Sequence, residues 1–144
     1  MSRNRNKKAN KGSKGFHGKV SNSFLEKNSL KEGVFSTDTG LQYMIIKEGD
    51  GIQPMETDEV TVNQRALLLN GKVITDTYKK GEPSQFKVSE ALEGLKEGLL
   101  LMKEGSRYKL FLPPELAWGD KGSSSRIPPN AVVVFDIHII KVDF

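Results

Sequence analysis

Cysteine and histidine, which often serve as nucleophiles, bases and metal ligands, are absent or rare in this chain of 144 residues. It contains no cysteine, which excludes disulfides, thiolate metal sites and cysteine nucleophiles. Its two histidines, His17 and His138, lie far apart in sequence, which argues against a histidine metal site or a catalytic triad. We therefore expect neither a metal site built on cysteine or histidine nor a histidine-based catalytic triad.

One polar side chain interrupts an otherwise apolar strand face. Gln64 shares the parity of four apolar residues within a β-like segment, namely Val60, Val62, Ala66 and Leu68. A polar residue at a strand position that the pattern assigns to the core marks a functional site more often than it reflects chance. The alternative is a strand whose outward face changes at a bulge. We favour the first interpretation, which places Gln64 in a binding pocket.

Alternating or continuous apolar runs predict strands that would position such a pocket. They begin at Leu41 and continue over residues 60–69, 72–77, 107–112 and 132–142. Asn70-Gly71 lies between two of them and is a strong hairpin signal. Residues 89–102 form a clear amphipathic helix, with Ala91, Leu92, Leu95, Leu99 and Met102 on one stripe. The order predicts an α+β domain, in which Gly94 and Gly98 let the helix approach an antiparallel sheet closely.

The N-terminal segment differs from the rest in charge. Residues 1–22 hold seven lysines and arginines and no acidic residue, whereas the remainder holds 15 basic and 18 acidic residues. With so few apolar residues, residues 1–22 are predicted to be a disordered basic arm. This arm is expected either to contact RNA or a ribosome or simply to improve solubility. Ser23 and Glu26 have the spacing of a capping box, which predicts a short helix and linker over residues 23–39.

Two further features bear on location. The basic N-terminal region is not followed by an apolar segment, so it does not have the pattern of a secretory signal. The longest uninterrupted apolar run covers residues 131–135, which is too short to span a bilayer. We therefore expect a cytoplasmic protein with no membrane contact.

Several motifs in one order resemble the FKBP-type peptidyl-prolyl isomerases. They are residues 98–105 (GLLLMKEG), 113–119 (PPELAWG), 127–130 (IPPN) and 134–136 (VFD). Residues 40–43 (GLQY) and 81–83 (GEP) with Phe86 resemble the bacterial Mip-like branch. The resemblance assigns residues 40–144 to the isomerase domain. It implies a twisted antiparallel sheet wrapped around one helix, and catalysis of rotation about the peptide bond before proline.

Carrying the family's pocket over by position gives a mixed result. The resemblance implies that Trp118, Phe135, Ile127, Leu95 and Phe86 are catalytic, and that Leu92, Ala91, Ile74, Gln64 and Thr75 bind substrate. Five positions depart from the pattern, with Gln64 and Trp118 each in place of Tyr, Ile74 in place of Phe, Thr75 in place of Asp and Leu95 in place of Trp. Asp76 is adjacent to Thr75, but a shift of one residue points a strand side chain to the opposite face.

The resemblance therefore implies a rotamase that helps proline-containing polypeptides to fold, with weakened activity and weak binding of macrolide inhibitors. It also implies that this activity needs no cofactor, no metal and no covalent intermediate. The alternative is a catalytically degraded chaperone or adaptor of the same fold, tethered to RNA or a ribosome by the basic arm. Residues 24–39 resemble the segment that joins a helical dimerisation domain to the isomerase domain in the Mip-like branch. Because the basic arm stands where that dimerisation domain would be, we expect a monomer.

Overall fold

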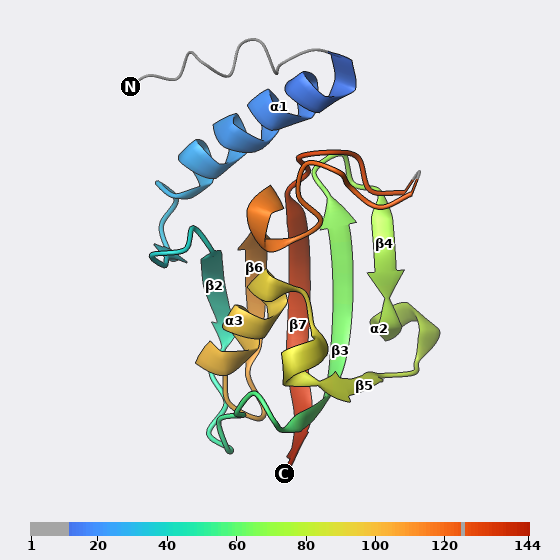
Figure 1. Ribbon diagram of the computed structural model, residues 1–144. Helices are drawn as coiled ribbons and strands as arrows, with labels where there is room; N and C mark the ends of the chain where they lie inside the picture. Colours follow the sequence, from blue (N-terminus) through green and yellow to red (C-terminus); the bar gives the residue numbers. More distant parts are fainter. Residues whose placement is uncertain (1–11, 125) are drawn as a thin grey trace.

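The computed structural model describes residues 12–124 and 126–144. Figure 1 shows a twisted sheet with one helix against a face and a second helix across one end. The helices are α1 (Gly12–Asn28), α2 (Thr77–Lys80) and α3 (Glu93–Leu101), with 3-10 turns η2 (Val88–Glu90) and η3 (Pro114–Leu116). The strands are β1 (Val34–Ser36), β2 (Gln42–Lys47), β3 (Glu59–Leu68), β4 (Val73–Asp76), β5 (Ser84–Lys87), β6 (Arg107–Leu112) and β7 (Val133–Asp143).

The described strands form one antiparallel sheet in the order β1-β2-β6-β7-β3-β4, and β5 also pairs with β3. The predicted hairpin joins β3 to β4 at Asn70-Gly71. Gly71 has a φ of 90°, which glycine adopts without steric cost, and its N–H donates to Leu68 O at 3.0 Å. The long central pair β3 and β7 sets the register for every side chain that follows.

The core lies between α3 and one face of the sheet, here called the inner face. Leu99 and Met102 are fully buried there against Leu110, Leu112 and Ile137. The helix lies close to the strands, as the two glycines predict. A Cβ on Gly94 would meet Leu112 Cγ at 2.5 Å, and one on Gly98 would clash with Leu110. The α+β fold predicted from the sequence is confirmed.

The predicted helix over residues 89–102 is correct in place but too long. A 3-10 turn occupies Val88–Glu90, and the α-helix begins at Glu93. Between them, Ala91 and Leu92 have ψ angles of 166° and 149°, values that lie outside the helical range. Both side chains nevertheless pack against the core. The apolar stripe therefore reflects burial of this segment without continuous helix.

The opposite, outer face of the sheet is covered in part by α1. Phe111, Val132 and Val134 form a second apolar cluster there, joined by Phe24 and Leu25 of the helix. Polar contacts fix the same helix. Ser21 Oγ donates to Asn130 O at 2.6 Å, and Asn28 Nδ2 donates to Gln42 Oε1 at 2.8 Å. Figure 1 shows α1 crossing the end of the sheet that is far from the C-terminus.

These contacts correct the prediction for the N-terminal segment. The sequence predicts disorder over residues 1–22, but α1 begins at Gly12, so the prediction is wrong for residues 12–22. Ser23, the expected N-cap, is exposed within the helix. The physical reason is that Ser21 and Asn28 are buried on the sheet side of α1, so polar residues anchor it where an apolar stripe is absent. Residues 1–11 lie outside the described part of the chain.

Candidate functional site

Eight of the ten site residues predicted from the sequence belong to one apolar cluster on the inner face. Leu95, Ile127 and Phe135 are buried in it. The other five are half-buried and pack against it, namely Ile74, Phe86, Ala91, Leu92 and Trp118. These residues come from β4, β5, the segment before α3, α3 itself, β7 and the loop between η3 and β7. The fold therefore gathers side chains from separate elements into an apolar surface with half-exposed edges.

The loop that carries Trp118 and Ile127 is held by its own backbone. Ser123 and Ile127 form an isolated bridge with hydrogen bonds of 2.9 and 3.1 Å. Asn130 N donates to Gly119 O at 2.9 Å, which joins the two ends of the loop. Gly122 has a φ of 68°, and a Cβ there would strike Ile127 O. These contacts keep Ile127 turned into the cluster.

The two polar residues of the predicted site also face inward. Gln64 lies opposite Ile137 of β7, and Thr75 lies opposite Ala66, which in turn lies opposite Phe135. Residues opposite each other on neighbouring strands point to the same face. The register shift between β3 and β4 adds a residue in β4, not in β3, so Gln64 keeps the parity of Val60 and Ala66. The bulge alternative for Gln64 is therefore wrong.

The side chain of Gln64 is only partly satisfied. Its Nε2 donates to Ser84 Oγ at a long 3.4 Å. Its Oε1 is buried and has no hydrogen-bond partner. Among the described residues, no other buried side-chain nitrogen or oxygen lacks one. The backbone is held firmly by contrast, because Gln64 N donates to Thr77 Oγ1 at 2.7 Å. The residue that the sequence marks as anomalous is thus anomalous in its contacts too.

Three polar residues around this site were missed by the sequence analysis. Ser84 accepts from Gln64, Thr77 accepts from its backbone, and Arg126 Nη2 donates to Ile74 O at 2.6 Å. Beside them lies a hollow of about 500 Å³ lined by Thr75, Thr77, Lys80, Gly81, Glu82, Pro83 and Ser84. Strand β5 has four residues, too few for its alternation to show which side chain faces inward.

Asp76 does not take the place of the missing pocket carboxylate. It caps α2 by accepting from Lys79 N at 3.0 Å, and its carboxylate lies 3.5 Å from Arg65 Nε. Its strand position opposite Arg65 puts it on the outer face. This agrees with the expectation that a shift of one residue sends Asp76 away from the pocket.

A charged cluster on the outer face is built from β6, β7 and α2. Arg107 donates to both carboxylate oxygens of Asp136 at 2.8 and 2.9 Å and lies over the Tyr78 ring at 5.3 Å. Burial, together with the neighbouring Asp136, raises the pKa of Tyr78 to about 12. Burial and the cations Lys47 and Arg107 lower the pKa of His138. His138 lies on this face, away from the apolar cluster.

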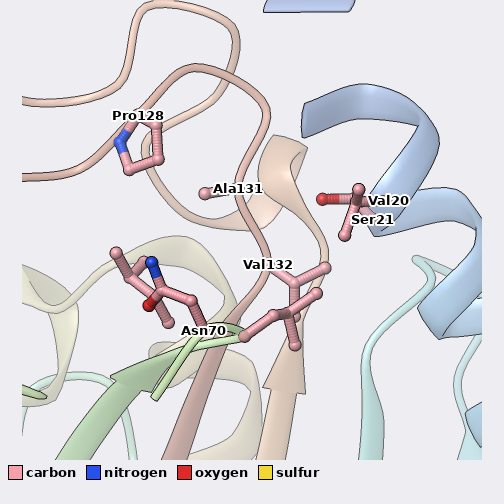
Figure 2. Close-up of a pocket in the computed structure, with 8 residues that line it drawn as sticks. Val20, Ser21, Asn70, Pro128, Ala131 and Val132 are labelled. Carbon is pink, nitrogen blue, oxygen red and sulfur yellow. The ribbon is translucent and has the colours of Figure 1, made fainter. Parts of the chain in front are cut away.

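A second hollow, of about 290 Å³, lies between α1 and the ends of β3 and β7. Figure 2 shows Val20 and Ser21 of α1 on one side of it, and Asn70 and Pro128 on the other. None of the ten predicted site residues lines this hollow. It therefore belongs to the contact of α1 with the sheet.

No helix in the described part of the chain is long and apolar enough to cross a membrane. Within the same residues, no group of three or more histidine, aspartate or glutamate side chains is placed to hold a metal ion.

Comparison with known proteins identifies relatives for most of the chain. The family described as FKBP-type peptidyl-prolyl cis-trans isomerase matches residues 50–140. The domain described as amino terminal to it matches residues 2–45. The chain is 40% identical over 119 residues to the FKBP-type 22 kDa peptidyl-prolyl cis-trans isomerase of Escherichia coli K12. It is 38% identical over 122 residues to the peptidyl-prolyl cis-trans isomerase Mip of Coxiella burnetii.

The aligned region covers 83% of this chain and 58% of the Escherichia coli protein, and 85% of this chain and 53% of Mip. The chain therefore spans little more than half the length of these relatives. The crystal structure of FkpA from Escherichia coli superposes with a TM-score of 0.85 at 36% identity, over 89% of this chain and 60% of FkpA.

Proposed function

Since the chain belongs to the FKBP-type peptidyl-prolyl cis-trans isomerase family, we propose that it catalyses isomerisation of the peptide bond before proline in polypeptides. The observation that carries this proposal is the inner-face cluster, which joins eight apolar side chains from separate elements. Four of them lie in the family motifs, namely Phe86, Trp118, Ile127 and Phe135. A rival function as a catalytically degraded chaperone or adaptor stays a prediction, because it rests only on the pocket substitutions.

Isomerisation of a peptide bond before proline requires the substrate to be bound but needs no covalent step. Rotation about a peptide bond meets a barrier of about 18–20 kcal/mol, which comes from amide resonance. The twisted amide has lost that resonance and is less polar, so a dry apolar surface favours it over the planar ground state. The half-buried members of the cluster, Phe86 and Leu92 among them, supply such a surface for the prolyl ring above the buried Leu95 and Phe135. Trp118 at its half-exposed edge adds a large ring with an indole N–H that can donate to the substrate.

We expect the activity to be lower than that of a pocket lined by aromatic rings. Ile74 and Leu95 keep the surface apolar but remove ring edges, and Gln64 brings a polar amide into it. The same losses should make macrolide inhibitors of the family bind weakly. Exchange NMR of a short X-Pro peptide, with the protein at catalytic concentration, tests the proposal. A rate equal to that of the peptide alone would contradict it.

We further propose that the basic segment, residues 1–22, contacts RNA or a ribosome. Its seven positive charges without an acidic residue support this, since neutralising phosphates releases counterions and gives salt-dependent binding. Lys19 is exposed on α1, so at least one of these charges is accessible beside the folded domain. A tail that only aids solubility is the alternative, and the location in the cytoplasm stays a prediction.

The test should change charge and leave α1 intact, because a truncation to Ser23 would remove the buried Ser21. Replacing the seven lysines and arginines with glutamine keeps the chain length. Fluorescence anisotropy with labelled single-stranded RNA should show binding at low salt that the substituted chain loses. Equal binding by both chains would contradict the proposal.

A further inference from the structure

The apolar cluster has a polar corner, and this corner is built from three elements. Gln64 of β3 and Thr75 of β4 both face inward beside the cluster. Ser84 of β5 completes it, with its Oγ 3.4 Å from Gln64 Nε2. The cluster and the corner are continuous, because Ala66 lies between Thr75 and Phe135 in the sheet.

The corner holds unused hydrogen-bonding capacity. Gln64 Oε1 is buried without a partner, and a buried polar atom in that state destabilises the fold. Turning the amide over would pair the oxygen with Ser84 and leave the nitrogen unpaired instead, so one end lacks a partner in either orientation. Gln64 itself is half-buried, and in the turned orientation its oxygen would lie where Nε2 now meets Ser84, a residue that lines the hollow described next. Ser84 would then use one lone pair of this oxygen, which leaves the second lone pair for a donor on a bound molecule.

A hollow of about 500 Å³ adjoins the corner and shares its walls. Ser84 and Thr75 line it, together with Thr77, which also holds the Gln64 backbone at 2.7 Å. The rest of its lining is the segment from Lys80 to Pro83, whose side chains include one cation and one anion. Hydroxyl groups thus dominate the part next to Gln64, and the opposite charges of Lys80 and Glu82 give no net preference for a charged group.

We propose that Gln64 and this hollow form a subsite for the uncharged polar side chain of a residue next to the substrate proline. The occupant would be serine, threonine, asparagine or glutamine, whose hydroxyl or amide N–H donates to Gln64 Oε1. An apolar side chain in the same place would lack this hydrogen bond, and a site built to hydrogen-bond a substrate group discriminates against a substrate that lacks the group. The inference rests on the proposed isomerase function and names a substrate preference for it.

The kinetic test compares two series of short peptides, one varying the residue before proline and the other the residue after it. Serine, asparagine and leucine are placed at the varied position, and kcat/KM is measured by exchange NMR. One net hydrogen bond predicts a preference of about three- to tenfold for serine and asparagine over leucine in one of the series. Gln64→Leu should abolish or reverse this preference. The matched control is Gln85→Leu, because Gln85 is exposed on β5, and it should keep the preference.

A binding measurement on the unsubstituted chain separates this inference from the isomerase proposal. The side-chain amide resonances of Gln64 should shift when the preferred serine peptide is added and stay in place with the leucine peptide. Such a shift without any isomerisation would support the subsite and contradict the isomerase function. Isomerisation of all peptides at similar kcat/KM, with the Gln64 amide resonances unmoved, would overturn the subsite and leave the isomerase function standing.

Discussion

At the residue scale, the candidate site combines positions that keep the family pattern with positions that depart from it. Phe135 and Ile127 are buried in the cluster, while Trp118 is half-exposed at its edge. A buried residue of this kind contributes to the core whatever the function. A half-exposed ring can instead contact a substrate, so Trp118 is the better residue for testing the role of the site.

Replacing Trp118 with alanine should lower kcat/KM for a Leu-Pro peptide about tenfold or more, because a single ring contact at the transition state is worth roughly 1 kcal/mol beyond its apolar area. Exchange NMR measures the rate, and circular dichroism confirms that the variant is folded. Phe144→Ala is the matched control, since Phe144 is 86% exposed. An unchanged rate in Trp118→Ala would mean that substrate binds elsewhere.

The double substitution Gln64→Tyr with Thr75→Asp should raise the isomerase rate. It replaces an amide that has a buried, unpartnered oxygen with a ring, and it adds a carboxylate that can accept from the tyrosine hydroxyl. The two positions are diagonal neighbours on β3 and β4, within reach of long side chains. The same peptide assay measures the effect, with both single substitutions as controls. A rate below that of the unchanged chain would show that the pocket positions are assigned wrongly.

At the element scale, five of the seven described strands could be predicted from the sequence, whereas the short strands β1 and β5 and the helix α1 could not. The hairpin at Asn70-Gly71 and the parity of Gln64 follow from local rules about turns and pleated strands. Helix α1 is anchored to the sheet by the buried polar residues Ser21 and Asn28. Hydrophobic periodicity reveals a helix only where apolar residues recur on one face, so it does not reveal this one. Ser84 was missed for a related reason, because a strand as short as β5 carries too little alternation to fix its inward face.

Ser21→Ala should lower the free energy of unfolding by about 1 kcal/mol, since it removes a buried hydrogen bond between α1 and the loop before β7. Urea denaturation measures the loss. The matched control is Ser23→Ala, because Ser23 is exposed on the same helix and its replacement should change little. Equal stability of the two variants would show that α1 is not fixed to the sheet through Ser21.

The outer face of β7 should make stability depend on pH. The pKa of His138 is lowered in the folded state by burial and then by Lys47 and Arg107, so the unfolded chain binds a proton more readily. Stability from this group is present above the unfolded pKa of about 6.5 and falls as pH drops through the lower, folded pKa. Urea denaturation between pH 7.5 and 5.5 should show this fall, and His138→Asn should reduce it. An identical fall in the variant would assign it to other groups.

At the scale of the whole molecule, the sequence predicts the α+β architecture and the basic N-terminal segment better than it predicts where the folded part begins. The antiparallel sheet with α3 on one face follows from the run of apolar segments and from the two glycines of the helix. The sequence predicts that the folded part starts at Ser23, whereas α1 begins at Gly12. Composition alone does not distinguish a basic helix with polar anchors from a disordered arm. Tertiary contacts therefore decide where this domain begins.

The same tertiary contacts support the prediction of a monomer. The buried side of α1 is directed at the chain's own sheet, where Phe24 and Leu25 pack on Phe111. The large apolar side chains with the highest exposure among the described residues, Leu30 and Phe144 at 86% each, lie far apart in sequence and belong to neither apolar cluster. These two side chains alone supply too little apolar area for a stable homodimer, which usually buries well over 1,000 Å² in total. Light scattering over micromolar concentrations should give the mass of one chain, and a concentration-dependent rise to twice that mass would contradict the prediction.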